Sequence, residues 1–285
     1  MSRQEYKARD FWITHTTEED GPHETIPHDH YDDSFCITFI LTGSGTCYVE
    51  GTAYPLSAGT IMVISPDEIR WFQLEQSGYH ERITLYFSGS ILTSLWGYEL
   101  PLIQRFIANP SEFGNWFTRE HYDSAVVNPV LEELRALLVS DTDMKGPRLH
   151  LLILQLLFAL YDARRHNAEQ PVMSEPDTVI LEICKYIKSH LQEDLSYQFF
   201  QKQFFVSRYQ LTEKFKQQTG MTLTKYVNTK RLMQVITNVR KGMRLEAAAY
   251  DAGFRTYCHF YKEFVKHFEK APKAYFKTEQ QKKDG

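Results

Sequence analysis

The last third of the chain contains a segment that repeats at a distance of 49 residues, and this repeat constrains the fold more than any other feature. Each copy predicts two short helices: "SYQFFQKQFF" then "SRYQLTEKFKQQTG" in the first, and "LEAAAYDAGF" then "TYCHFYKEFVKHF" in the second. Five positions of matching chemistry coincide at this offset: Phe205 with Phe254, Ser207 with Thr256, Leu211 with Phe260, Phe215 with Phe264, and Tyr226 with Tyr275. Two helix–turn–helix units explain this most simply, and buried helical hairpins are the alternative.

The ends of these helices carry capping residues, and a longer helix connects the two units. Ser196, Ser207 and Thr256 are expected N-caps, and Gly220 is the expected C-cap of the first unit. The connecting segment "TLTKYVNTKRLMQVITNV" predicts a helix of about 18 residues, or ~27 Å. When the width of the two units is added, the expected separation of their second helices is close to one turn of DNA, ~34 Å. They would then enter successive major grooves on one face of a duplex.

The charge of the chain also separates the helical last third from the residues before it. From Glu175 to the end there are 20 Lys and Arg against 12 Asp and Glu, a balance of +8. The preceding residues carry −12, and the whole chain −4. A basic module beside an acidic one indicates a polyanionic partner for the basic half.

The first part of the chain has a different period. From about Ile26 to Phe87, short alternating strands are separated by Gly and Pro turns, which predicts an antiparallel sandwich or barrel. Two helices follow, "NPVLEELRALLVS", with Pro129 near its start, and "GPRLHLLILQLLFALYDARRH". The second helix is apolar almost all round, so its own domain, a second subunit, or both must cover it. We expect three regions: an effector-binding and dimerisation domain at 1–166, a polar linker at 167–176, and a DNA-binding domain at 177–285.

Composition excludes several other classes of protein. No apolar run reaches the ~20 residues of a membrane span, and the first residues lack the apolar core of a signal peptide. The four cysteines are scattered, which indicates a reduced, cytoplasmic protein.

The helical third resembles the DNA-binding domain of the AraC/XylS family of bacterial transcription regulators. The matching pieces are "FFVSRYQLTEKFKQQTG", "KRLMQV" and "AAAYDAGFRTYCHFYKEFVKHFEKAPKAYF". The segment "LTGSGTCYVEGTAYPLSAGTIMVISPDEIRWF" resembles the cupin-like effector domain of that family. The resemblance implies an α+β multidomain fold, with a cupin-like antiparallel β-barrel and C-terminal helices followed by an all-α domain with two helix–turn–helix motifs. Glu269, Phe276 and Val235 depart from the family, which often has Gly, Arg and Ala there.

The outward positions of each second helix are the expected contacts to base edges. They are Arg208, Tyr209, Thr212, Glu213 and Lys216 in the first unit, and Thr256, Tyr257, Cys258, His259, Lys262 and Lys266 in the second. For each of them the alternative is solvated surface. The expected phosphate contacts are Lys202, Lys214, Lys230, Arg231, Arg255 and Lys273, although the resemblance favours a structural role for Arg231.

A small-molecule pocket is expected in the first domain, with polar groups against an aromatic wall. Its candidate residues are His28, His30, Tyr48, Trp71, Arg82, Thr84 and Tyr86. Such a set suits a sugar; the alternative is that Trp71 and Tyr86 are core residues and His28 lies on the surface. The resemblance places Arg70 and Cys36 where cupin metal sites have His and Glu, so we expect neither a metal nor a cofactor.

Together these observations predict a ligand-responsive, sequence-specific regulator rather than an enzyme. Its expected partners are a double-stranded operator, a small effector such as a sugar, a second copy of the chain through "LHLLILQLLFALYDARR", and RNA polymerase if it activates. Ligand binding would shift the equilibrium between dimer geometries. A cupin-type metalloenzyme and a ligand-independent DNA-binding protein are the alternatives.

Overall fold

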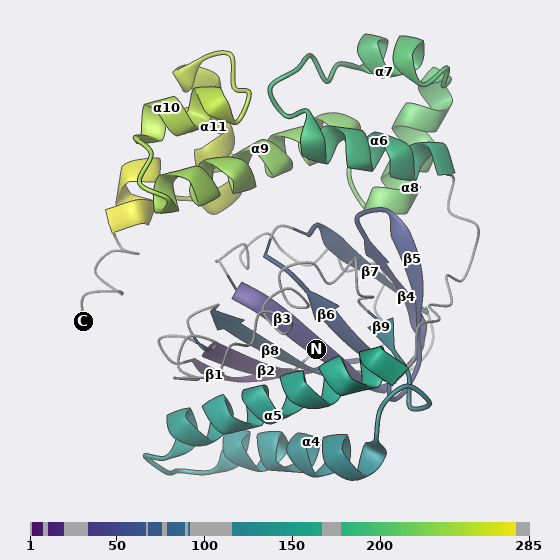
Figure 1. The fold of residues 1–285 in the computed structure, drawn as a ribbon, viewed down its shortest axis with the longest axis vertical. Coiled ribbons are helices and arrows are strands. Elements are labelled where there is room, and N and C mark those ends of the chain that lie inside the picture. Colours follow the sequence, from purple (N-terminus) through teal and green to yellow (C-terminus); the bar gives the residue numbers. More distant parts are fainter. Residues whose placement is uncertain are drawn as a thin grey trace.

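The computed structural model describes residues 2–7, 11–19, 34–66, 68–75, 79–88, 91, 116–166 and 178–277. Figure 1 shows a β-sheet part with two helices beneath it and a wholly helical part above it. The expected linker, 167–176, lies outside the described residues.

The β part consists of two antiparallel sheets. The strands are β1 (Ser2–Lys7), β2 (Phe11–Glu19), β3 (Ser34–Thr42), β4 (Gly45–Val49), β5 (Thr52–Leu56), β6 (Ile61–Ile64), β7 (Arg70–Leu74), β8 (Tyr79–Ser88) and β9 (Trp116–Phe117). The larger sheet has the order β1-β2-β8-β3-β6-β9, and the smaller has the order β5-β4-β7. Inward side chains of both sheets share one apolar cluster that includes Cys36, Met62, Cys47 and Phe72. The described strands therefore form two packed sheets and not the closed barrel that we expected.

Strands β1 and β2 precede the point where we expected the sheet to begin. Strand β2 pairs with β8 from Phe11 opposite Phe87 to Glu19 opposite Tyr79. The segment of β1, "SRQEYK", has only one apolar side chain, so its sequence gives little sign of a strand. Pairing with β2 supplies the hydrogen bonds that its side chains do not predict.

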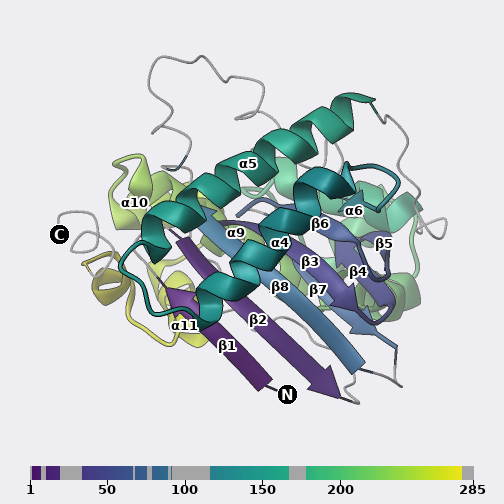
Figure 2. The same ribbon diagram turned by 90° about the horizontal axis from the view of Figure 1, so that it is seen from below.

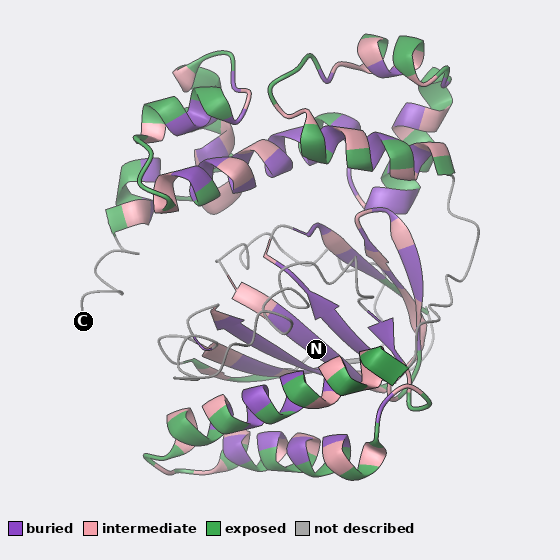
Figure 3. Cartoon of the chain, in the orientation of Figure 1, coloured by how far each residue is buried: buried purple, intermediate pink, exposed green. Residues whose placement is uncertain are grey.

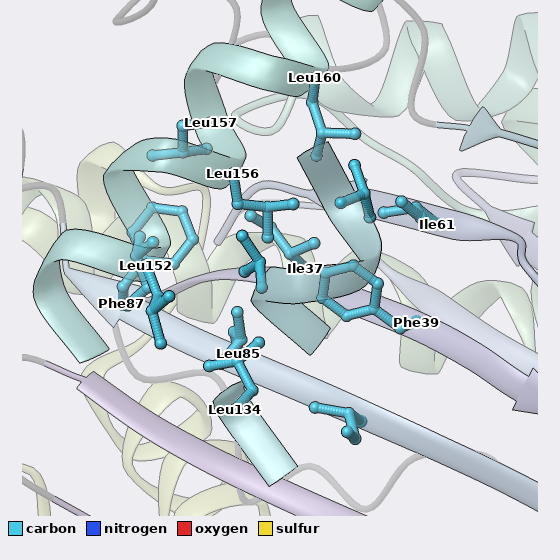
Figure 4. Packing of buried hydrophobic residues seen from close by; sticks show 14 of the residues in the cluster. Ile37, Phe39, Ile61, Leu85, Phe87, Leu134, Leu152, Leu156, Leu157 and Leu160 are labelled. Carbon is cyan, nitrogen blue, oxygen red and sulfur yellow. The ribbon is translucent and has the colours of Figure 1, made fainter. Parts of the chain in front are cut away.

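Two helices cover the outer face of the larger sheet, α4 (Ser124–Val139) and α5 (Lys145–His166), as seen from below in Figure 2. Helix α4 begins earlier than expected, because Asp123 caps it and accepts a hydrogen bond from Ala125 N, so Pro129 lies inside the helix. Figure 4 shows the core between sheet and helices, in which leucines of both helices meet Ile37, Phe39, Leu85 and Phe87.

The helical part is built around one long helix. Its elements are α6 (Thr178–Ser189), α7 (Tyr197–Gln203), the π-helical turn η2 (Gln210–Lys214), α8 (Phe215–Thr219), α9 (Leu223–Arg240), α10 (Leu245–Asp251) and α11 (Tyr257–Phe268). The first half of α9 contributes to a core with α6, α7 and α8, and its second half to a separate core with α10 and α11. Figure 3 shows buried positions along most of α9, as this shared role requires.

Within the described parts of the chain, no helix combines the length and the apolar character that a membrane crossing demands.

Candidate nucleic-acid interface and effector site

Both predicted helix–turn–helix units form, and their caps are the expected ones. Ser196 Oγ accepts from Phe199 N at 3.2 Å, and Thr256 Oγ1 accepts from His259 N at 3.2 Å. Ser207 Oγ accepts from Gln210 N at 3.2 Å, while Ser207 N donates to Gln210 Oε1 at 2.9 Å. This reciprocal pair is a capping box, which fixes the start of the first recognition helix. Gly220 ends that helix with φ +74°.

The two faces of each recognition helix are those predicted. Leu211, Phe215, Phe260 and Phe264 are fully buried. The opposite positions are exposed, apart from the half-buried Thr212 and Tyr257; they are Arg208, Tyr209, Glu213, Lys216, Thr256, Cys258, His259, Lys262 and Lys266. The first unit therefore offers cations, a carboxylate and an aromatic ring, and the second offers cations, an imidazole and a thiol.

The first recognition helix is not a regular α-helix. A π-helical turn spans Gln210–Lys214, and within it Thr212 Oγ1 donates to Arg208 O at 3.1 Å. The threonine hydroxyl is therefore already engaged by its own helix. Turns of this kind occur mostly as single insertions in α-helices, frequently at functional sites.

The turn of the first unit corrects one of the five predicted matches. Phe254 is buried in the second unit, whereas Phe205 is almost fully exposed. Phe205 has φ +53°, and in the turn of the second unit the residue with positive φ is Gly253, at +92°. Phe205 thus corresponds to Gly253 and the buried Val206 to Phe254, because the first turn is one residue shorter. The other four matches pair residues of like burial.

One predicted phosphate contact is wrong and another has its expected structural role. Lys230 is only 4% exposed, and its Nζ lies 2.7 Å from Glu50 Oε1 in the β part. Arg231 donates from Nε to Leu191 O at 2.9 Å and from Nη2 to Glu193 O at 3.0 Å, so it holds the connection after α6. The remaining four are exposed: Lys202, Lys214, Arg255 and Lys273.

The contact of Lys230 belongs to a junction between the two parts of the chain. The tip of the β4–β5 hairpin, Glu50 and Gly51, reaches the base of the first unit. Glu50 accepts from Tyr226 Oη at 2.6 Å and from Ile69 N, and Gly51 O accepts from Gln218 Nε2 at 2.8 Å. Burial and the neighbouring Cys184 and Glu50 raise the pKa of Tyr226 well above its usual value.

The tryptophan of β7 also belongs to this junction and not to a ligand pocket. Trp71 Nε1 donates to Gln218 O at 3.4 Å, and the indole stacks on Tyr48 with ring centroids 4.4 Å apart. Tyr48 and Trp71 therefore lie on the outer face of the smaller sheet. They were expected to line the same pocket as the β8 residues, and the structure separates the two groups.

Arg82, Thr84 and Tyr86 share the inner face of β8, as their alternation predicts, and each of them lies against another side chain of the sheets. Tyr86 stacks on Trp12 at 4.8 Å, and burial raises the Tyr86 pKa. Thr84 Oγ1 lies 3.2 Å from Thr38 Oγ1, and the Arg82 guanidinium lies 5.8 Å from the Phe72 ring centre. His28 and His30 lie outside the described residues.

A cavity of about 280 Å³ opens elsewhere, between α4 and the edge of the larger sheet. Phe39, Ile61 and Leu131 give it an apolar floor, and Arg119, Asn128, Glu132 and Arg135 give it a polar rim. Arg135 pairs with Glu81 at 3.0 Å and with Glu132 at 3.6 Å. Sequence reasoning missed this site, because its residues come from four separate segments with no shared motif.

Comparison with known families follows the same division of the chain. Residues 16–139 match the family described as AraC-like ligand binding domain, and residues 201–278 match a helix-turn-helix domain family. The chain belongs to the AraC family of transcription regulators. As an AraC-family protein it is a ligand-responsive, DNA-binding transcription regulator, with a small-molecule domain before its DNA-binding domain.

Relatives match this AraC-family regulator over most of its length. The HTH-type transcriptional activator RhaS of Pectobacterium atrosepticum is 23% identical over 92% of this chain and 91% of its own. RhaS of Klebsiella pneumoniae is also 23% identical, over 88% of each chain. The crystal structure of ToxT from Vibrio cholerae is similar over 94% of this chain and 97% of that one, with 16% identity and a TM-score of 0.38.

Proposed function

We propose that this regulator binds a duplex operator through both recognition helices at once. The observation that carries the proposal is the pair of capped helices with exposed polar and basic faces, joined by α9, which has 18 residues. A helix of that length spans ~27 Å, so the two units suit grooves one turn apart. Base contacts would come from the eleven predicted residues, and phosphate contacts from Lys202, Lys214, Arg255 and Lys273.

Selection of duplexes from a randomised pool by the full-length chain tests this proposal. We expect an enriched site whose protected positions form two clusters about one helical turn apart. The affinity should fall steeply with salt, because bound cations release counterions from DNA. Failure to enrich any duplex would refute direct sequence recognition.

A homodimer formed through α5 is the assembly we propose. Leu151 and Phe158 are 68% and 39% exposed and lie seven residues apart, so they share one stripe on the outward side of α5. Sedimentation of a Leu151→Asp, Phe158→Asp variant should show a monomer. Ala136→Asp, on the exposed side of α4, adds a charge outside the stripe and should leave the dimer intact. Equal behaviour of the two variants would argue against this interface.

The effector site we favour is the cavity under α4, at about 280 Å³, because the pocket beside Arg82 on β8 measures only about 10 Å³. A rim with a guanidinium, an amide and a carboxylate above an apolar floor suits a small hydroxylated compound such as a sugar. Thermal-shift measurements with a panel of neutral and acidic sugars test the site. Arg119→Met should abolish a shift that Arg148→Met, on α5, preserves. A shift that survives Arg119→Met would place the effector elsewhere.

Activation of transcription, by binding and not by catalysis, is the output we propose for a cytoplasmic protein of this kind. The RhaS relatives are named transcriptional activators and match over nearly their whole length. Transcription in vitro from a template carrying the selected site, with purified RNA polymerase, should rise on addition of the protein. A fall would make it a repressor, and indifference to every effector would favour the ligand-independent alternative.

A further inference from the structure

Phe205 is the most exposed large apolar side chain in the described parts of the protein, at 94%. Its neighbours follow the usual pattern, since Phe200 is fully buried and Phe204 is half-buried. A single exposed apolar residue is common on protein surfaces. What distinguishes Phe205 is that its backbone is also in an unfavourable conformation.

The backbone of Phe205 lies in the left-handed region, with φ +53°. This region is sterically unfavourable for any residue with a Cβ atom, and for a bulky residue it is a marked outlier. The second unit uses Gly253 at the corresponding place, where the cost does not arise. Phe205 gains almost no burial within the chain, so neither the turn nor the core accounts for a phenylalanine here. Strain of this kind gathers at functional sites.

The position of Phe205 indicates what it contacts. It lies two residues before Ser207, the cap of the first recognition helix, so at most about 7 Å of chain separates it from that end. Exposed Arg208 and Tyr209 follow the cap, and exposed Lys202 precedes the turn. A surface with two cations, Arg208 and Lys202, near one apolar ring complements a polyanion that has apolar groups in its groove, which describes duplex DNA.

We propose that Phe205 packs against the C5-methyl group of a thymine at the edge of the groove entered by the first recognition helix. Thymine methyl is the apolar group that the major groove presents, and Phe is among the side chains that contact it. The proposal rests on the proposed function, since it needs the first unit to face DNA. It adds an apolar, sequence-reading contact that lies in the turn and outside the recognition helix.

The test uses the full-length chain, the duplex enriched by selection, and Phe205→Gly. Because glycine accepts positive φ, the variant should unfold at the same temperature as wild type or higher, yet bind about tenfold more weakly. The slope of affinity against salt should not change, since no cation is lost. Phe205→Leu keeps an apolar side chain and should bind with intermediate affinity.

Replacing each thymine of the selected duplex by deoxyuridine completes the test. At one position the loss of the methyl group should weaken wild type but not Phe205→Gly. If Phe205→Gly binds within twofold of wild type, or if no position shows this coupling, the inference is overturned while the operator-binding proposal stands. If Phe205→Gly keeps its DNA affinity but loses transcription, Phe205 contacts a protein, and the proposed contact with DNA is overturned as well. If wild type enriches no duplex, the proposed function itself fails.

Discussion

The substitution Glu50→Asn has two opposing effects on stability. It suits the backbone conformation of a hairpin turn, and it removes contacts at the junction between the two domains. Glu50 and Gly51 form the tip of the β4–β5 hairpin, with φ of +50° and +81°. Two-residue hairpin turns with positive φ at both positions strongly prefer Asn-Gly. If the hairpin alone mattered, asparagine would be the better residue and the variant would be more stable than wild type.

The junction predicts the opposite sign. The Glu50 carboxylate accepts from Tyr226 Oη at 2.6 Å and Lys230 Nζ at 2.7 Å, and Lys230 is only 4% exposed. Removing one partner of a buried ion pair costs about 3–5 kcal/mol, because the other charge is left without compensation. Relief of the left-handed glutamate returns about 1 kcal/mol. We therefore expect Glu50→Asn to lose about 2–4 kcal/mol of stability.

Thermal and denaturant unfolding of the full chain measure this change, with intrinsic fluorescence as the probe because Trp71 lies in the junction. The control is the double variant Glu50→Asn, Lys230→Met, which removes the orphaned ammonium and keeps an apolar side chain of similar length. It should regain most of the loss, since a buried pair replaced by apolar groups is often neutral.

Two results would refute this reasoning. A Glu50→Asn protein as stable as wild type would mean that the pair is solvated and worth the ~0–1 kcal/mol of a surface salt bridge. A double variant no more stable than the single one would mean that the cost does not come from Lys230.

Three further predictions concern the DNA-binding domain. Lys262→Ala should weaken binding to the selected duplex and relax its sequence preference, and unchanged affinity and preference would show that Lys262, exposed on α11, does not read bases. Glu269→Gly should stabilise the domain by about 1 kcal/mol in thermal unfolding, because Glu269 caps α11 at φ +53°; a lower melting temperature would contradict the strain. Because the pKa of Tyr226 is raised by burial first, and then by Cys184 and Glu50, its stabilisation is present below pH 10 and declines as the pH rises above that value. Melting temperatures between pH 8 and 11 should fall less for Tyr226→Phe than for wild type. If the melting temperatures of the two proteins depend on pH in the same way, Tyr226 is not the group responsible.

The local features of the DNA-binding domain could be predicted because they depend on nearby residues. Caps such as Ser207 and Thr256 follow from hydrogen bonds that reach three residues along the chain. The buried face of α11 follows from helical spacing, which places Phe260 and Phe264 together. The turn before Ser207 was not predicted correctly. It is one residue shorter than the turn of the second unit, and this difference leaves the 49-residue offset of the two second helices unchanged.

The junction and the cavity between α4 and the larger sheet could not be predicted because they depend on long-range contacts. Lys230 lies in a helix of mixed composition and looks like any phosphate-binding lysine until Glu50, distant in sequence, is placed beside it. Trp71 and Phe72 are both buried, one against the other domain and one between the sheets. Alternation alone cannot tell which of two buried faces is the interior. One signal was available: glutamate stands at a hairpin tip where asparagine is favoured, and such a mismatch indicates a partner.

The position of the junction suggests how the effector domain acts on DNA. The hydrogen bonds that Glu50, Gly51 and Trp71 make to the helical part all go to the first unit, at the C-terminal end of its recognition helix, or to α9. The N-terminal end of that helix, where Ser207 caps it, stays exposed for a duplex. The two units have separate cores that meet along α9, so a shift of the hairpin tip pulls on the first unit more directly than on the second. If both units dock at once, as we propose, the spacing between them must be fixed, and we then expect a small change at the junction to alter operator affinity.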